Sequence, residues 1–169
     1  MAIFGQPRTS SARRLRARQL VLVAGIALAT VGVGCESSQK QIDAGVSAIK
    51  SGDYDRALTI LVPLAKGGQS RAAVELGNMY ALGWGVPVDD GLADGWFQKA
   101  ESGGVPPGRS QLDIAFTLAK GHGTKRDPAR AQVWLQKSAS LGYDKATALM
   151  ANADELKRKG FTGEESNGQ

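Results

Sequence analysis

Apolar residues along the chain recur with the spacing of amphipathic α-helices. In residues 72–80 and again in residues 93–100, apolar or small side chains stand at i, i+3, i+4 and i+7, and therefore share one face of a helix. The same spacing predicts helices at about 39–51, 54–66, 70–82, 90–102, 110–120, 128–141 and 145–158. The fold predicted from this pattern is all-α.

The predicted helices repeat in pairs. A shift of 38 residues places Trp96 on Trp134 and Asp89 on Asp127, and a shift of 36 extends the match back to Asp53. A single repeat of this length cannot bury its apolar face, so several repeats must stack to form a continuous core. The pattern therefore predicts an α-solenoid of about three helical hairpins, ended by a C-terminal capping helix.

Residues at matching places of the repeats predict how the helices begin and end. Asp127 precedes a proline, which is typical of a helix N-terminus whose free N–H groups are capped by the aspartate side chain. Asp53 and Asp89 hold the same place and are predicted to cap in the same way. Gly83 and Gly121 stand where the first helix of each pair ends, and glycine there is expected to adopt a positive φ.

Two further positions predict how the hairpins pack. Gly77 and Ala115 occupy the same place in their repeats, where a small side chain lets two helix backbones approach closely. Trp96 and Trp134 are matching large residues, and we expect them to fill the groove between neighbouring hairpins. Because the chain has one cysteine, it has no internal disulfide, and packing alone must hold the fold.

The first 34 residues differ in character from the repeats. Residues 1–19 are polar and rich in arginine, whereas residues 20–34 are uncharged and mostly apolar. The apolar run has the length of a signal-peptide core and is shorter than the roughly 18 residues expected of a spanning helix. We therefore predict a signal peptide at 1–34, and an uncleaved membrane anchor is the alternative.

The overall charge of +5 does not indicate a nucleic-acid-binding protein, because five arginines in the first 34 residues account for all of it. The rest of the chain has 16 basic and 16 acidic residues. A balanced chain of this kind lacks the excess of lysine and arginine that binds phosphate backbones. Nucleic acid is therefore excluded as an expected partner.

The only cysteine, Cys35, directly follows the apolar run. The segment Gly32-Val33-Gly34-Cys35 resembles the lipobox of bacterial lipoproteins, although glycine replaces the usual leucine at its first position. The resemblance implies that Cys35 is lipidated and becomes the first residue of the mature chain, on the periplasmic side of the cell envelope. Glu36 after it slightly favours the outer membrane. An exported protein with a free thiol is the alternative.

Residues 73–100 resemble a Sel1-like repeat. They carry, in order, a small residue, Leu-Gly, Tyr, a Gly-x-Gly-Val loop, Asp, Ala, Trp-Phe and Lys-Ala. Residues 111–142 resemble a degenerate copy, and the hairpin at 39–68 is closer to the related tetratricopeptide type. The resemblance implies an α-solenoid with a concave inner face, of the kind that serves as an adaptor in protein complexes. The expected organisation is a tether at 35–41, a repeat domain at 42–158 and a flexible tail at 159–169.

The sequence offers no group of residues that predicts catalysis. His122 is the only histidine, and it stands in a loop where the preceding repeat has Trp84. One histidine and one cysteine do not make a zinc site of nitrogen and sulfur ligands, and no cofactor is expected. Cysteine-rich Sel1-like proteins are associated with penicillin binding or cleavage, which makes a hydrolase the remote alternative. Those proteins have regular cysteine pairs, which this chain lacks.

The expected function is therefore that of a membrane-tethered scaffold that binds a protein and turns over no small-molecule substrate. In hairpin stacks the first helix of each pair tends to line the concave face. The predicted partner-binding residues on these helices are Glu75, Met79, Asp113 and Phe116, an apolar pair within a polar strip. The alternative is a binder of peptidoglycan or exported polysaccharide, which a row of exposed aromatic residues would favour. Phe116 has no aromatic counterpart in the preceding repeat.

Overall fold

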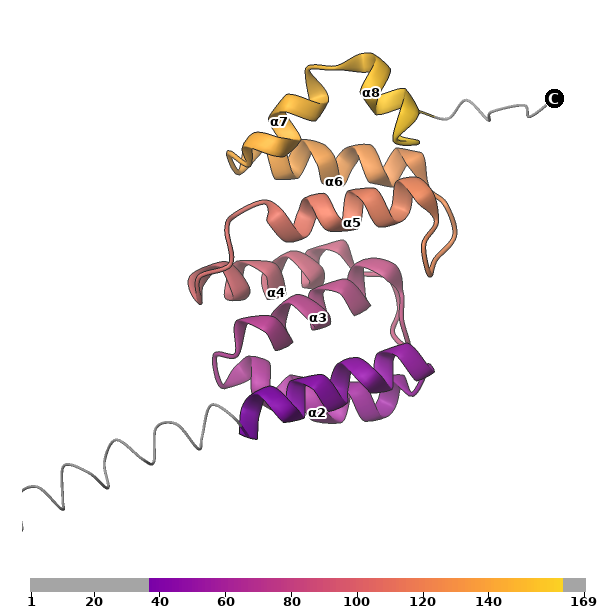
Figure 1. Cartoon of the computed structure of the whole chain (residues 1–169). Coiled ribbons are helices and arrows are strands. Elements are labelled where there is room, and N and C mark those ends of the chain that lie inside the picture. The colour runs from indigo at the N-terminus through magenta and orange to yellow at the C-terminus, as the bar shows by residue number, and fades with distance from the viewer. Residues whose placement is uncertain (1–36, 163–169) are drawn as a thin grey trace, which may run out of the picture. The chain divides into compact units, whose positions relative to one another are not determined.

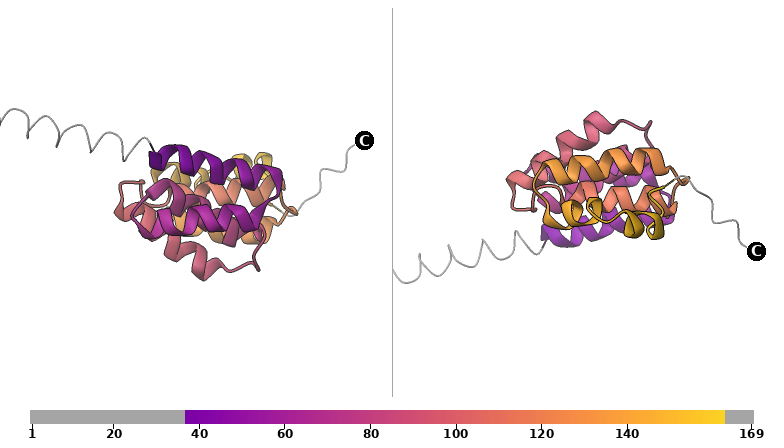
Figure 2. Two further views of the ribbon diagram at one scale, coloured as in Figure 1. Left: turned by 90° about the horizontal axis from the view of Figure 1, so that it is seen from below. Right: turned by 90° about the horizontal axis from the view of Figure 1, so that it is seen from above.

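A computed structural model of the chain describes residues 37–162, and every regular element in this range is a helix. Residues 37–51 are helical. They are followed by α2 (Tyr54–Lys66), α3 (Ser70–Leu82), α4 (Asp90–Ser102), α5 (Arg109–Lys120), α6 (Pro128–Ser140), α7 (Asp144–Met150) and α8 (Ala153–Arg158). The helices lie one above another in chain order (Figure 1), and the views along the stack show successive hairpins laid over each other (Figure 2). The prediction of an all-α hairpin solenoid is confirmed.

Aspartate side chains begin three of the helices, as the repeat pattern predicted. The Asp53 carboxylate accepts a hydrogen bond of 3.3 Å from the backbone N–H of Arg56, three residues later, at the start of α2. The corresponding distances are 2.8 Å for Asp89 at α4 and 3.0 Å for Asp127 at α6. Each contact satisfies a backbone donor that the helix itself leaves free, so these residues act as caps.

Glycines in the left-handed conformation end the first helices of the hairpins. Gly83 after α3 has φ +72° and Gly121 after α5 has φ +75°. The residue after each glycine donates its N–H to a carbonyl five residues back, Trp84 to Met79 at 2.9 Å and His122 to Thr117 at 3.1 Å. This pair of features is the Schellman motif, which favours glycine because its backbone tolerates positive φ.

The core consists of two clusters of buried side chains. The first cluster joins the helix at 37–51 and α2 to α3 and α4, and the second is shared by α3 to α7 and by Phe161 after α8. Their buried members run from Ile42 to Phe161, so the chain from residue 37 onward contains all of them. In the second cluster the Trp134 ring stands edge-on to Phe97, with ring centroids 5.9 Å apart.

Trp96 does not fill the groove between hairpins as we predicted. Trp134 is 1% exposed, but Trp96 is only partly buried, at the edge of the first cluster. The neighbouring Phe97, which is fully buried, takes the inner position on α4. A glycine on α3, Gly77, leaves room for its ring, and so the phenylalanine rather than the tryptophan faces inward.

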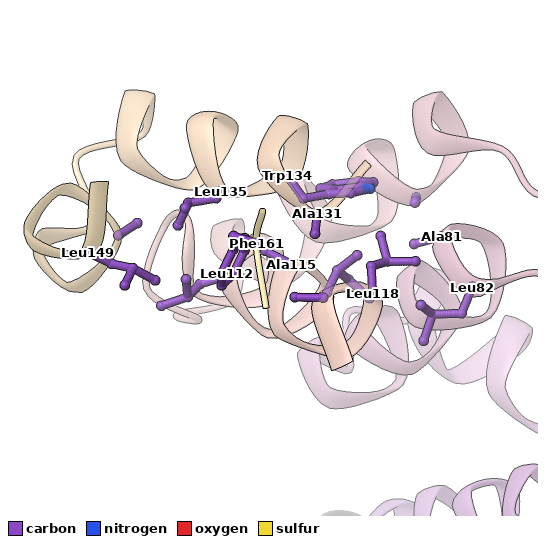
Figure 3. Close-up of a cluster of buried hydrophobic side chains, with 14 of the residues drawn as sticks. Ala81, Leu82, Leu112, Ala115, Leu118, Ala131, Trp134, Leu135, Leu149 and Phe161 are labelled. Carbon is purple, nitrogen blue, oxygen red and sulfur yellow. The ribbon is translucent and has the colours of Figure 1, made fainter. Parts of the chain in front are cut away.

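The C-terminal end differs from the prediction in two ways. The helix expected at 145–158 is broken into α7 and α8, because the Asn152 side chain accepts from the N–H of Glu155 at 3.0 Å and starts a new helix. The segment expected to be a flexible tail from residue 159 contains Phe161, which is fully buried in the second cluster (Figure 3). Residues 163–169 lie outside the described range.

Phe161 is held in place by hydrogen bonds to the backbone around it. Arg126 donates to the carbonyls of Gly160 at 3.2 Å and Thr162 at 3.1 Å, and Gln132 donates to that of Phe161 at 2.6 Å. Gly160 has φ +84°, and the Phe161 N–H donates five residues back at 3.1 Å. The end of α8 therefore repeats the Schellman motif, and Phe161 takes the place that Trp84 and His122 hold in the earlier repeats.

The predicted signal peptide at 1–34 and the lipidation site Cys35 lie outside the described residues. Within residues 37–162, no helix has the length and apolar character needed to cross a membrane. The helices pack within the compact unit that begins at Gln41.

Candidate functional site

Glu75 on α3 and Asp113 on α5 stand at matching positions and have matching surroundings. Burial raises the pKa of the Glu75 carboxyl, against the hydrogen bond from Asn78 and the charges of Arg71 and Lys50. Burial likewise raises the pKa of Asp113, against the charges of Arg109 and Lys145. Each acid thus lies near an arginine of its own helix. Each also lies near a lysine of the first helix in an adjacent hairpin. The first helices therefore share one face, which carries alternating charges.

Met79 does not belong to this face, and its assignment to a partner site was wrong. Its side chain is fully buried in the first core cluster together with Leu76, three residues before it. An inner helix of the stack is covered twice, by its own hairpin partner and by the preceding hairpin. Met79 is therefore buried, although its repeat position is compatible with a place on the surface of an isolated hairpin.

Phe116 on α5 is partly buried, because the C-terminal segment covers one side of its ring. The ring is edge-on to Phe161, with centroids 5.4 Å apart and planes at 72°. The ammonium group of Lys159 lies 5.6 Å from the centre of the Phe116 ring, within the range of a cation–π contact. Phe116 also lines a hollow in the surface.

This hollow, which we call the α5–α8 hollow, lies between α5 and the broken pair α7 and α8. Its volume is about 290 Å³. Its lining is apolar at the floor and charged at the rim: Leu112, Phe116, Ala148 and Leu149, with Lys145, Glu155 and Lys159. Leu112 and Leu149 are 6% and 5% exposed, so the floor is part of the core surface.

A second hollow of about 320 Å³ lies between α3 and α5. Val74, Val105 and Pro106 make its apolar part, and Arg71, Arg109 and Asp113 are its charged lining. Arg71 forms a salt bridge with Asp43, in which Nη1 and Oδ1 are 2.6 Å apart. Both hollows therefore combine an apolar surface with charges of both signs, on either side of α5.

A third hollow, of about 650 Å³ beside residues 124–130, is lined by residues that already have structural roles. Asp127 caps α6, and Arg126 holds the C-terminal segment. Arg130 pairs with Asp90 at 2.5 Å and also donates to the carbonyl of Ala81 at 2.8 Å. These contacts tie neighbouring hairpins together, so this hollow is a by-product of the loop packing.

His122 is the only histidine of the chain. His122 is exposed in its loop. Among residues 37–162, no three of histidine, cysteine, aspartate and glutamate come together in a way that could hold a metal ion. What the first helices offer is a surface for binding.

Three residues that complete the α5–α8 hollow were not among the predicted site residues. Lys145, Leu149 and Lys159 were assigned to an unbroken capping helix and a tail. A pattern in the sequence marks the end of that helix: the pair Gly160-Phe161 aligns with Gly83-Trp84 when the three-residue insertion at the helix break is allowed for. That alignment predicts that a further Schellman turn ends the last helix, with an aromatic residue directly after its glycine.

The repeated hairpins place the described chain among the α-solenoids. Residues 70–105 and 108–143 match the Sel1 repeat, so the hairpins α3–α4 and α5–α6 are both similar to it. The chain is also similar to a Sel1 repeat protein from Oxalobacter formigenes known from its crystal structure. The sequence identity is 28%, the match covers 74% of this chain and 97% of the other, and the TM-score is 0.42. The comparison with curated proteins found no match.

Proposed function

We propose that this chain is a membrane-tethered scaffold that binds a protein partner in a bacterial cell envelope. The repeats would be held on the periplasmic side by a lipid on Cys35, with the outer membrane slightly favoured. The two Sel1 repeats support the interaction role, since such repeats are consistent with protein binding rather than turnover. The lipobox-like segment that ends at Cys35 supports the tether.

The observation that carries the proposal is the α5–α8 hollow. An apolar floor inside a charged rim is the arrangement in which protein interfaces concentrate binding energy. At about 290 Å³, the hollow is at the lower limit of small-molecule sites, which span roughly 300–1,000 Å³. It therefore suits one or two side chains of a partner better than a whole small ligand. Polysaccharide binding has less support, because every aromatic side chain in residues 37–162 is buried or partly buried.

A pull-down from envelope extract tests the proposal. The bait is the chain from residue 37 onward, which contains the whole described core. Lys145→Glu changes the rim of the hollow in the first turn of α7, where an acidic residue is favourable to the helix. Arg56→Glu in the first turn of α2 is the matched control. We expect one or more proteins to be captured by the wild type and the control and lost with Lys145→Glu. Capture of glycan alone would contradict the proposal.

A further inference from the structure

The chemistry of the α5–α8 hollow indicates what kind of partner segment it accepts. Its floor consists of the side chains of Leu112, Phe116 and Leu149, which hold no polar group. An occupant must present an apolar side chain there, because a polar group would lose its contacts with water and find no hydrogen-bond partner. The open rim leaves the rest of the occupant in contact with solvent.

The rim has more positive than negative charge. Lys145 comes from α7 and Lys159 from the residue after α8, and Glu155 is the only acid in the lining. Glu155 lies 4.0 Å from Lys159 and offsets part of its charge. Asp113 of α5 attracts Lys145 from outside the lining, but Arg109 of the same helix offsets Asp113 in turn. The hollow therefore favours a negative charge beside the buried apolar group.

The break between α7 and α8 is what opens this site. The matching α3 is one continuous helix of 13 residues, whereas the capping contact of Asn152 divides the last helix after Met150. The hydrogen bonds that Arg126 and Gln132 donate to the backbone carbonyls of Thr162 and Phe161 hold the Phe161 ring against the Phe116 ring. Because these contacts fix the aromatic floor, the hollow is formed before any partner binds, which reduces the entropic cost of binding.

We propose that the α5–α8 hollow binds a peptide segment of the partner in which an apolar side chain is flanked by aspartate or glutamate. The apolar side chain lies on Phe116, Leu112 and Leu149, and the acidic groups face Lys145 and Lys159. This inference rests on the proposed function, since it specifies the partner of the same surface. The charged contacts are exposed, so they contribute mainly to specificity and association rate, and the apolar anchor contributes most of the affinity.

Selection from a random dodecapeptide library on the purified chain from residue 37 onward tests the inference. We expect the enriched peptides to share an apolar residue with acidic neighbours. The most enriched peptide, labelled with fluorescein, is then titrated against the protein by fluorescence anisotropy. Lys145→Glu together with Lys159→Glu should weaken its binding about tenfold, the scale expected for reversing two exposed charge pairs. The matched double variant Arg56→Glu with Lys66→Glu, on α2, should bind as the wild type does.

The inference would be overturned by enriched peptides without acidic residues, by equal binding of the two double variants, or by no enrichment at all. Each leaves the proposed function separately testable, because the pull-down reports capture of a whole protein. Capture without peptide enrichment would mean that the scaffold binds a folded surface. Binding that Phe116→Ser leaves unchanged, in a variant shown by circular dichroism to be folded, would place the peptide elsewhere on the molecule.

Discussion

The ring of Phe97 on α4 lies directly against the backbone of Gly77 on α3. A β-carbon at Gly77 would be 2.3 Å from Cε1 of Phe97, well inside the distance of any real contact. The glycine thus lets the two helices of the hairpin approach closely and leaves space for the only large residue of α4 that is fully buried. The matching positions of the next repeat hold Ala115 and the smaller Leu135, and both are buried in the second cluster.

The first prediction follows from this contact. Gly77→Ala should lower the free energy of unfolding by about 1–3 kcal/mol, because the added methyl group displaces the Phe97 ring from a packed core. Gly95→Ala on α4 is the matched control: its β-carbon would meet no atom within 4 Å. That change should raise stability by about 0.5–1 kcal/mol, the usual advantage of alanine over glycine inside a helix. Urea denaturation measures both, and equal effects would contradict the packing described.

The two tryptophans at matching repeat positions should differ in importance. Trp134→Ala should cost about 3–5 kcal/mol, as expected for removal of a large buried aromatic side chain. Trp96→Ala should cost clearly less, since Trp96 keeps part of its surface in solvent. Guanidinium denaturation of the two variants gives the comparison. If Trp96→Ala is the more damaging change, the inward position on α4 belongs to Trp96 and not to Phe97.

The raised pKa of Glu75 predicts a pH-dependent stability. A carboxyl whose pKa is higher in the folded state binds its proton more tightly there than in the unfolded chain. Stability is therefore lost as the pH rises from the ordinary pKa of 4.5 through the raised value. Glu75→Gln removes this ionisation, so it should raise the free energy of unfolding at pH 7 and have little effect below about pH 4. Denaturation at both pH values measures the difference; a Gln variant less stable at pH 7 would contradict the assignment of burial as the main cause.

The predicted lipid anchor depends on Cys35. Cys35→Ala should move the protein from the membrane fraction to the soluble periplasmic fraction, because a thioether-linked lipid needs the thiol. Mass spectrometry of the mature N-terminus should find a modified Cys35 as the first residue in the wild type. Unchanged membrane association of Cys35→Ala would instead favour an uncleaved apolar segment at 20–34 as the anchor.

Much of the fold could be predicted from the sequence, because helix periodicity and caps are local. The helix boundaries around Asp89 and Asp127 depend on residues within one turn of each other, and both were correct. The hairpins matched to the Sel1 repeat follow from residues spaced along a single unit. In these cases the interactions that determine the structure lie close together in the chain.

The candidate site could be predicted only in part, because it depends on contacts between hairpins. Phe116 was found as an unusual apolar residue in the repeat, but Met79 looked equally exposed and is buried by the preceding hairpin. The hollow beside Phe116 exists because Asn152 breaks the last helix and Phe161 returns to the core. Neither event follows from the apolar spacing of residues 145–158, which suits an unbroken helix equally well.

Photo-crosslinking in intact cells shows directly whether the α5–α8 hollow contacts a protein. A benzophenone amino acid replaces Ala148, an exposed residue at the α5–α8 hollow, and in a second strain it replaces Arg56, an exposed residue of α2. We expect illumination to crosslink a protein at position 148 and none at position 56. We also expect Lys145→Glu to reduce the crosslinked product at position 148. Equal products at the two positions, or no protein product at position 148, would contradict the claim that this surface binds a protein partner.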